Sequence, residues 1–310
     1  MKRIFLIAAA MTLIASVAIA ALPQSRYFLH GDGVLSLATN KGPQKFHGRF
    51  RNPDGTFDQA ALAQINRVFS ARAGDPLGEV SPRLIEFIDF IQDQFSPRAL
   101  VTITSGFRSP ERNAALRDNG ALAAKASLHQ YGMAADLWIK GVPSERIWDF
   151  VREQAAGGTG FYHGKNVHLD VGPARFWDET SSKVDTDISD DNKLIGLITD
   201  RDIYLPGEQM MLRFIRMTAY PIGVDPRFTL ERKTEDGTWK KAQDAGPSFP
   251  VRSEAKCLAM SSMEEMSGIG WRVPEGLSPG RYRIRADFCE KRFDKMPDQV
   301  ATPEFEVSAI

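Results

Sequence analysis

Two short stretches of the chain, SLHQYGMAAD (residues 127–136) and NVHLDVG (residues 166–172), place two of its five histidines close to two aspartates. In the first stretch, Asp136 lies seven positions after His129, which would put the pair two turns apart on a helix and on opposite faces of a strand. Neither element brings both side chains to one point. The stretch therefore predicts a loop that carries His129, a turn at Gly132 and then a strand that carries Asp136.

The second stretch alternates polar and apolar residues, as a half-buried strand does. Its polar face carries His168 and Asp170. A lone histidine on such a strand is more often a hydrogen-bonded structural residue than a ligand. Taken with His129 and Asp136, however, His168 completes two imidazoles and one carboxylate, the protein ligand set of a catalytic zinc site. Iron oxygenases use the same set, so these residues alone leave the metal open.

The motifs around both stretches resemble the zinc D-Ala-D-Ala peptidase superfamily, whose signature is Ser-x-His, then Gly, Ala and Asp, and a later His. The upstream segment SGFRSPERNAALR (residues 105–117) is similar to the SGYRSP segment of that superfamily. The segment GTGFYHGKNVHLDVGPARFW (residues 158–177) is similar to the last motif of the MepK-type murein endopeptidases. The resemblance covers residues 27–177, and the residues in register with the signature are Ser127, His129, Gly132, Ala134 and Asp136.

This resemblance implies a peptidase that holds one zinc ion with His129, Asp136 and His168. It also implies that Arg108 points into the cleft, where it would stabilise an oxyanion or bind a substrate carboxylate. The alternative for Arg108 is an ordinary surface arginine. Ser127, at the start of the signature, is a second candidate for substrate binding.

The general base is the point at which the chain departs from better-known relatives. Those relatives carry Glu, Asp or His two or three residues before the last ligand, where this chain has Lys165 and Asn166. Asp170 is the candidate either to accept a proton from water or to orient His168 as its hydrogen-bond partner. His163, in the loop before the strand, is the second candidate for acid/base catalysis, and its alternative is an exposed loop histidine.

The N-terminus predicts export. A basic start, MKR, precedes an apolar run over residues 4–19 and the A-x-A pattern of a signal-peptidase site at residues 18–20. We expect cleavage after Ala20 and a periplasmic or otherwise exported protein. The alternative is an uncleaved inner-membrane anchor, since short spans need only about 17 residues.

Composition excludes one class of partner and bears on the redox state. With 39 basic and 39 acidic residues the charge balances, so nothing favours a nucleic acid or a membrane surface as partner.

Both cysteines, Cys257 and Cys289, fall in the C-terminal part of the chain. In an exported protein such a pair predicts a disulfide, and two free buried thiols are the alternative.

The expected fold class is α+β, with a Hedgehog/D-Ala-D-Ala peptidase-like domain over residues 27–178, in which helices pack against a small antiparallel sheet. Its first two helices are predicted to begin at Asp58 and at Pro82. An acidic, polar linker over residues 179–192 leads to residues 193–310, where strands broken by Pro-Gly and Asp-Gly turns predict an Ig-like β-sandwich.

The function that these features predict is zinc-dependent cleavage of peptide cross-links in peptidoglycan. Two alternatives stay open: a D,D- or L,D-carboxypeptidase that trims stem peptides, and a non-catalytic, zinc-containing protein that binds the cell wall. The C-terminal domain has no cluster of ligating residues, so it is expected to contact the wall or a protein partner, or to act as a structural cap.

Overall fold

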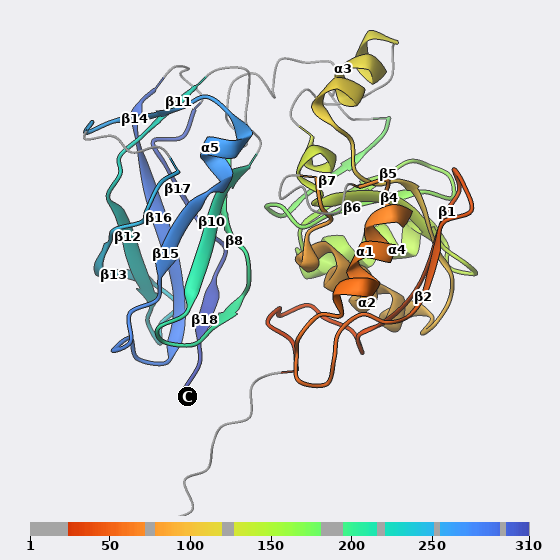
Figure 1. Ribbon diagram of the computed structural model, residues 1–310, viewed down its shortest axis with the longest axis horizontal. Helices are drawn as coiled ribbons and strands as arrows, with labels where there is room; N and C mark the ends of the chain where they lie inside the picture. Colours follow the sequence, from red (N-terminus) through yellow and green to blue (C-terminus); the bar gives the residue numbers. More distant parts are fainter. Residues whose placement is uncertain are drawn as a thin grey trace, which may run out of the picture.

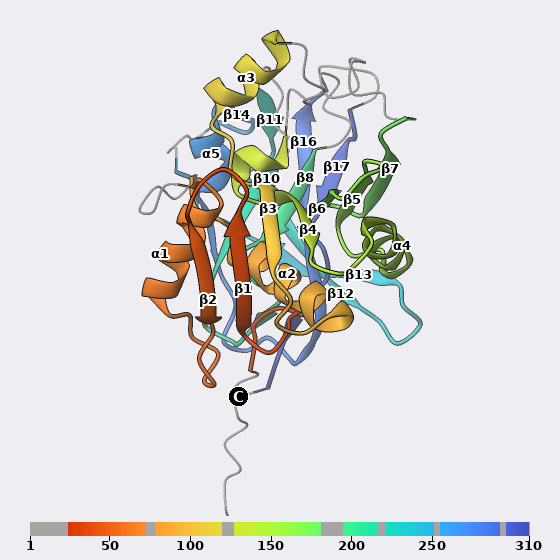
Figure 2. The same ribbon diagram turned by 90° about the vertical axis from the view of Figure 1, so that its right-hand side faces the viewer.

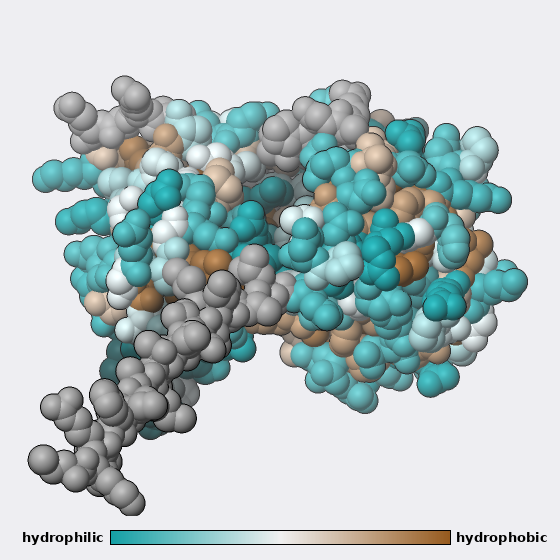
Figure 3. Space-filling model, turned by 60° about the horizontal axis from the view of Figure 1, so that its bottom comes forward, coloured by the Kyte–Doolittle hydropathy of each residue, from teal (hydrophilic) through white to brown (hydrophobic). Residues whose placement is uncertain are grey.

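The computed structural model consists of two bodies that lie side by side (Figure 1). One holds helices α1 to α4 and strands β1 to β7, and the other holds strands β8 to β18 and the short helix α5. Hydrophilic residues cover most of the face drawn in Figure 3. The structure describes residues 24–71, 78–119, 127–180, 195–215, 221–250, 255–291 and 296–309.

The predicted signal peptide (residues 1–20) lies outside the described residues, as does most of the predicted linker (residues 179–192). Among the described residues, no helix is both long enough and apolar enough to cross a membrane.

The first body is built on a seven-stranded sheet in the order β2-β1-β3-β4-β6-β5-β7. The prediction of a small antiparallel sheet is wrong, because β1 pairs in parallel with β3, and β5 with β7. The chain passes through two helices between β2 and β3, a crossover that allows the parallel pairing. Figure 2 shows β2, β1 and β3 side by side. The strands are Val34–Thr39 (β1), Lys45–Arg49 (β2), Val101–Ser105 (β3), Ala134–Ile139 (β4), Gly158–Phe161 (β5), Val167–Asp170 (β6) and Arg175–Asp178 (β7).

Local sequence sets where the helices begin. Asp58 caps α1 and accepts hydrogen bonds from the backbone N–H groups of Ala60 and Ala61. Pro82 opens α2, where its missing N–H costs nothing. Both predicted starts are therefore confirmed. The helices are Gln59–Val68 (α1), Pro82–Phe95 (α2), Pro110–Asp118 (α3) and Ser144–Gln154 (α4).

Alternation along β4 sorts its side chains between the two faces of the sheet. Ala135, Leu137 and Ile139 belong to one core together with the apolar residues of α1, α2 and α4. Asp136 therefore projects from the opposite face, as its place in the alternation predicts. That face carries the candidate metal ligands.

Helix α2 carries a fully buried carboxylate whose charge the fold penalises. Oδ2 of Asp89 accepts a hydrogen bond from the backbone N–H of Gly33 (2.8 Å), while Oδ1 has no partner among the described residues. Burial, together with the neighbouring Asp93 and Glu86, raises the pKa of Asp89 to about 8. The folded protein therefore keeps a proton on Asp89 that the unfolded chain, with an aspartate pKa of about 3.9, releases.

Because the folded protein binds this proton more tightly than the unfolded chain does, stability falls as pH rises. Between the unfolded pKa and the folded pKa of about 8, we expect the free energy of unfolding to fall as pH rises. Asp89 contributes a slope of at most about 1.4 kcal/mol per pH unit. Asp89→Asn should remove this contribution. Urea unfolding of both proteins at pH 5 and pH 8 measures it, and identical pH slopes would contradict the prediction.

The second body consists of a three-stranded sheet, β15-β10-β8, and an eight-stranded sheet whose main path is β13-β12-β16-β11-β14. A disulfide joins Cys257 to Cys289. Strands make up most of this body, as the pattern of residues 193–310 predicts. The elements are Gly196–Thr199 (β8), Ile203–Tyr204 (β9), Gln209–Ile215 (β10), Ile222–Val224 (β11), Phe228–Lys233 (β12), Trp239–Ala245 (β13), Leu258–Met260 (β14), Met263–Ser267 (α5), Ile269–Arg272 (β15), Gly280–Glu290 (β16), Gln299–Ala301 (β17) and Phe305–Val307 (β18).

The two bodies share an apolar contact directly behind the His129 stretch. Ile198 of β8 and Ile215 of β10 pack in one buried cluster with residues on both sides of His129. An ion pair between the half-buried Arg83 of α2 and the buried Asp202 adds a polar contact beside it. The first body's partners in the cluster are Leu128, Tyr131, Met133 and Ala134.

Candidate metal centre

Strand pairing and one short turn bring the three predicted ligands together. In the antiparallel pair of β4 and β6, Asp136 lies directly opposite His168. His129 comes from the 3₁₀ turn Leu128–Tyr131 (η1), just before β4. One ligand atom from each of the three side chains lies within 4.8 Å of the others, and all three residues are buried.

The turn that presents His129 has a defined start and end. The hydroxyl of Ser127 accepts a hydrogen bond from the backbone N–H of His129 and so caps η1. Gly132 ends the turn with φ +64°, and a Cβ there would lie 2.0 Å from the carbonyl oxygen of Glu79. Only glycine fits this position without strain. The predicted turn at Gly132 is therefore confirmed.

Hydrogen bonds fix which nitrogen of each imidazole faces the carboxylate. Nδ1 of His129 lies 2.8 Å from the carbonyl oxygen of Gly106, which can only accept, so Nδ1 carries the proton. The bare Nε2 faces Oδ1 of Asp136 at 3.6 Å. In His168, Nε2 lies 2.9 Å from Oδ2 of Asp170, and Nδ1 lies 3.0 Å from Oδ1 of Asp136. Each ring thus directs one nitrogen towards Asp136 and anchors the other.

Asp170 is fully buried and both of its oxygens are occupied. Arg175 donates to Oδ1 (2.8 Å) and to Oδ2 (2.6 Å), in addition to the bond from His168. Burial raises the pKa of Asp170, but the charge of Arg175 and the bond from His168 outweigh it and hold the pKa below its usual range. The paired strand leaves room for this pair because it carries Gly158, where a Cβ would lie 2.3 Å from Asp170 Oδ2.

Two donors flank Asp136. Nη2 of Arg108 bonds Oδ2 at 2.9 Å, and the hydroxyl of Tyr162 bonds Oδ1 at 3.2 Å. Burial raises the pKa of Asp136, but His129 and His168 outweigh it and hold the pKa well below the usual range. Asp136 is therefore an anion at neutral pH.

Tyr162 is the site residue that the sequence predictions missed. It lies in the matched segment FYHGK between β5 and β6, where an aromatic residue reads as strand-end packing. Burial, and then the nearby charge of Asp136, raise the pKa of Tyr162. The phenol therefore stays protonated and acts as a hydrogen-bond donor. The only sequence feature that could have indicated a role for Tyr162 is its position within the motif of residues 158–177.

The structure does not bring His163 to the three ligands. It lies in an exposed loop with φ +51°, where Nε2 contacts Asp178 at 2.8 Å and the ring packs against Phe161. Ser127 is buried, and its hydroxyl caps the turn of His129. Neither residue has a placement that supports the substrate or acid/base role predicted for it.

The three ligands fit a metal ion by their chemistry. His129 offers a bare Nε2, Asp136 offers a carboxylate, and His168 offers Nδ1 once a metal ion replaces the proton that this nitrogen shares with Asp136. Three protein ligands are what a catalytic metal site uses while it leaves a position open. The ring that Asp170 anchors has the carboxylate–histidine arrangement that orients metal ligands. His129, Asp136 and His168 can therefore hold one metal ion.

Comparison with known proteins agrees with this site. The sequence model of the family described as "Peptidoglycan L,D-endopeptidase MepK" matches residues 31–177, which span both ligand stretches. Residues 31–177 are thus similar to the MepK family. The predicted resemblance to the MepK branch of the zinc D-Ala-D-Ala peptidase superfamily is thereby confirmed. The MepK-family match ends at the last strand of the seven-stranded sheet, so it does not reach the second body.

Two curated relatives of this domain are informative. The peptidoglycan L,D-endopeptidase MepK of Escherichia coli (strain K12) is 34% identical over 120 residues, which cover 38% of this chain and 66% of the relative. The probable peptidoglycan L,D-endopeptidase MepK of Haemophilus influenzae is 29% identical over 146 residues, which cover 46% of this chain and 78% of the relative. The chain thus matches just under two thirds of the length of the first relative. A solved structure of toxic shock syndrome toxin-1 overlaps with a TM-score of 0.24, too low to show a common fold.

Proposed function

We propose that this protein is a zinc-dependent endopeptidase that cleaves peptide cross-links in peptidoglycan. The observation that carries the proposal is the buried convergence of His129, Asp136 and His168 within a domain similar to the MepK family. The matched relatives bear the name peptidoglycan L,D-endopeptidase, one of them as probable. The substrate is accordingly a peptide of the cell wall, and the metal ligands are His129, Asp136 and His168.

The chain's own residues divide the remaining work. A bound zinc ion would lower the pKa of a coordinated water to about 7 and polarise the scissile carbonyl. Asp170 orients His168 and does not serve as the base, because Arg175 and His168 occupy both of its oxygens. Arg108 and Tyr162 bond Asp136 in this structure, and in the proposed reaction they turn to the substrate carbonyl oxygen and stabilise its negative charge.

Tyr162→Phe tests the second of these donors. Removing the hydroxyl should lower kcat by about 10²- to 10³-fold, since one donor to a developing oxyanion contributes on this scale. The bound metal should stay stoichiometric, because Tyr162 is not a ligand. Steady-state kinetics with metal analysis by mass spectrometry measure both quantities. An unchanged kcat would remove Tyr162 from the mechanism.

Two rival functions are separable by their products. An endopeptidase converts cross-linked muropeptide dimers into monomers, whereas a D,D- or L,D-carboxypeptidase shortens free stem peptides and leaves dimers intact. A non-catalytic wall-binding protein binds peptidoglycan and changes neither. Digestion of purified peptidoglycan by the full chain, with products resolved by mass, distinguishes the three and identifies the bond that is cut. The proposal fails if the dimers persist.

The second body is proposed to be an Ig-like β-sandwich that supports the metal centre. Ile198 and Ile215 pack against the residues that flank His129, and this contact favours a structural cap over a free wall-binding module. Contact with the wall or with a protein partner is the alternative. The predicted signal peptide and the Cys257–Cys289 disulfide support an exported, periplasmic location.

A further inference from the structure

A small pocket lies beside the metal centre, next to Arg108. Nε of Arg108 donates to the hydroxyl of Ser105 (3.0 Å), and Ser105 lines the pocket. Since Arg108 also bonds Asp136, a single side chain links the pocket to a metal ligand. The pocket measures about 10 Å³, which is room for about one water molecule or one carboxylate oxygen.

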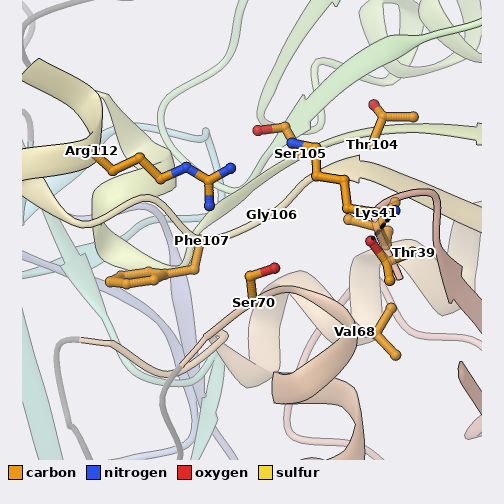
Figure 4. A pocket seen from close by; sticks show the side chains of 10 residues that line it. Thr39, Lys41, Val68, Ser70, Thr104, Ser105, Gly106, Phe107 and Arg112 are labelled. Carbon is orange, nitrogen blue, oxygen red and sulfur yellow. Dashed lines mark hydrogen bonds between the residues drawn. The ribbon is translucent and has the colours of Figure 1, made fainter. Parts of the chain in front are cut away.

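Two cationic side chains converge in this pocket from separate elements. Lys41 lies in the turn between β1 and β2, and Arg112 lies on α3. Figure 4 shows them entering from opposite sides, with their charged ends directed towards Ser105. The β1–β2 turn and α3 are more than 60 residues apart in the chain, so only the fold brings the two charges together.

The described residues place no ion-pairing carboxylate on Lys41 or Arg112, although the charge of Asp136 acts on Lys41 from nearby. Partial burial, and then the charges of Arg112 and Arg108, lower the pKa of Lys41. Two like charges held close together repel each other, and an anion placed between them relieves that repulsion.

The backbone conformation of Ser70, at the pocket wall, also supports an anion site. Ser70 follows the end of α1 with φ +59°, a left-handed conformation that favours glycine. The hydroxyl of Ser70 points into the pocket (Figure 4). Glycine would adopt this conformation with less strain, so the presence of serine suggests a role for its side chain. The hydroxyl of Ser70 can donate a hydrogen bond to an anion.

We propose that Lys41 and Arg112 bind a carboxylate of the substrate peptide beside the scissile bond. This inference rests on the proposed function and adds a substrate requirement to it: a free carboxylate in place of an amide near the bond that is cut. Arg108 links the carboxylate subsite to Asp136, so binding there places the scissile carbonyl near the metal ligands. Lys41 and Arg112 thus determine specificity and do not take part in bond cleavage.

The test compares two probes and two double variants of the full chain. The probes are a diaminopimelate-containing cross-linked stem peptide with free carboxylates and the same peptide with those carboxylates amidated. The variants are Lys41→Gln/Arg112→Gln and, as a control with the same loss of two charges, Lys45→Gln/Lys140→Gln, two exposed lysines outside the pocket. For each protein kcat/KM is measured with both probes, and Kd with the corresponding uncleaved monomer peptides.

We expect the wild-type protein and the control to prefer the free carboxylate by about 10-fold or more in kcat/KM and in Kd. In Lys41→Gln/Arg112→Gln this preference should fall to near one. A preference that is equal in the wild type and in this variant would overturn the inference. If the wild-type protein cleaves neither peptide, the proposed function fails, and the ratio of Kd values alone then decides whether the carboxylate subsite exists.

Discussion

Asp136→Asn is expected to abolish both metal binding and hydrolysis. Asp136 is the residue on which the site converges, since both histidines, Arg108 and Tyr162 contact its carboxylate. An amide keeps the shape of the side chain but removes the charge that a metal ion requires. We expect kcat/KM to fall by about 10³-fold or more. Metal content after dialysis should fall from one equivalent to near zero.

The matched control is Asp178→Asn. Asp178, the last residue of β7, is also an aspartate paired with a histidine, His163 of the exposed loop, and neither residue is one of the three ligands. The Asp178→Asn variant should keep one equivalent of metal and hydrolyse the substrate at the wild-type rate. Full activity in Asp136→Asn would show that the metal-ligand assignment is wrong.

Asp170→Asn should destabilise the fold and weaken the metal site together. The carboxylate forms a buried, bidentate pair with Arg175, and breaking a buried pair on one side typically costs about 3–5 kcal/mol. The same change removes the partner that orients His168, which typically lowers metal affinity by about 10- to 100-fold. Urea unfolding and competition with a chelator measure the two effects.

A comparison with Arg175→Met separates the two roles of Asp170. That variant breaks the same ion pair but leaves the carboxylate bonded to His168, so it should lose stability while it loses less metal affinity than Asp170→Asn. If Asp170→Asn instead binds metal with unchanged affinity and is inactive, Asp170 is the general base and its orienting role is wrong.

The local patterns around the metal ligands could be predicted from the sequence. Alternation placed Asp136 and His168 on polar strand faces, and Gly132 marked the turn that precedes β4. These features are local, because they depend on residue spacing and on the conformations that glycine allows. Spacing alone could not show that the two stretches form one site. The resemblance of their motifs to the peptidase superfamily predicted that His129, Asp136 and His168 come together.

Other features depend on contacts that no local pattern encodes. The pairing of Arg175 with Asp170 decides the role of that aspartate, and it arises from strand packing over Gly158. Strand β13 carries no clear strand pattern in the sequence, because five of its seven residues are exposed and it lacks apolar alternation. The apolar contact of Ile198 with the residues that flank His129 likewise could not be predicted from the sequence, since it joins two bodies of the chain.

The most direct test of the central claim is metal-dependent hydrolysis of cross-linked peptidoglycan by the full chain. The protein is assayed as purified, after removal of metal by a chelator, and after zinc is added back, with muropeptides resolved by mass. We predict that dimers become monomers, that chelation stops this conversion and that one equivalent of zinc restores it. Conversion that continues unchanged in the chelated, metal-free protein would contradict the account.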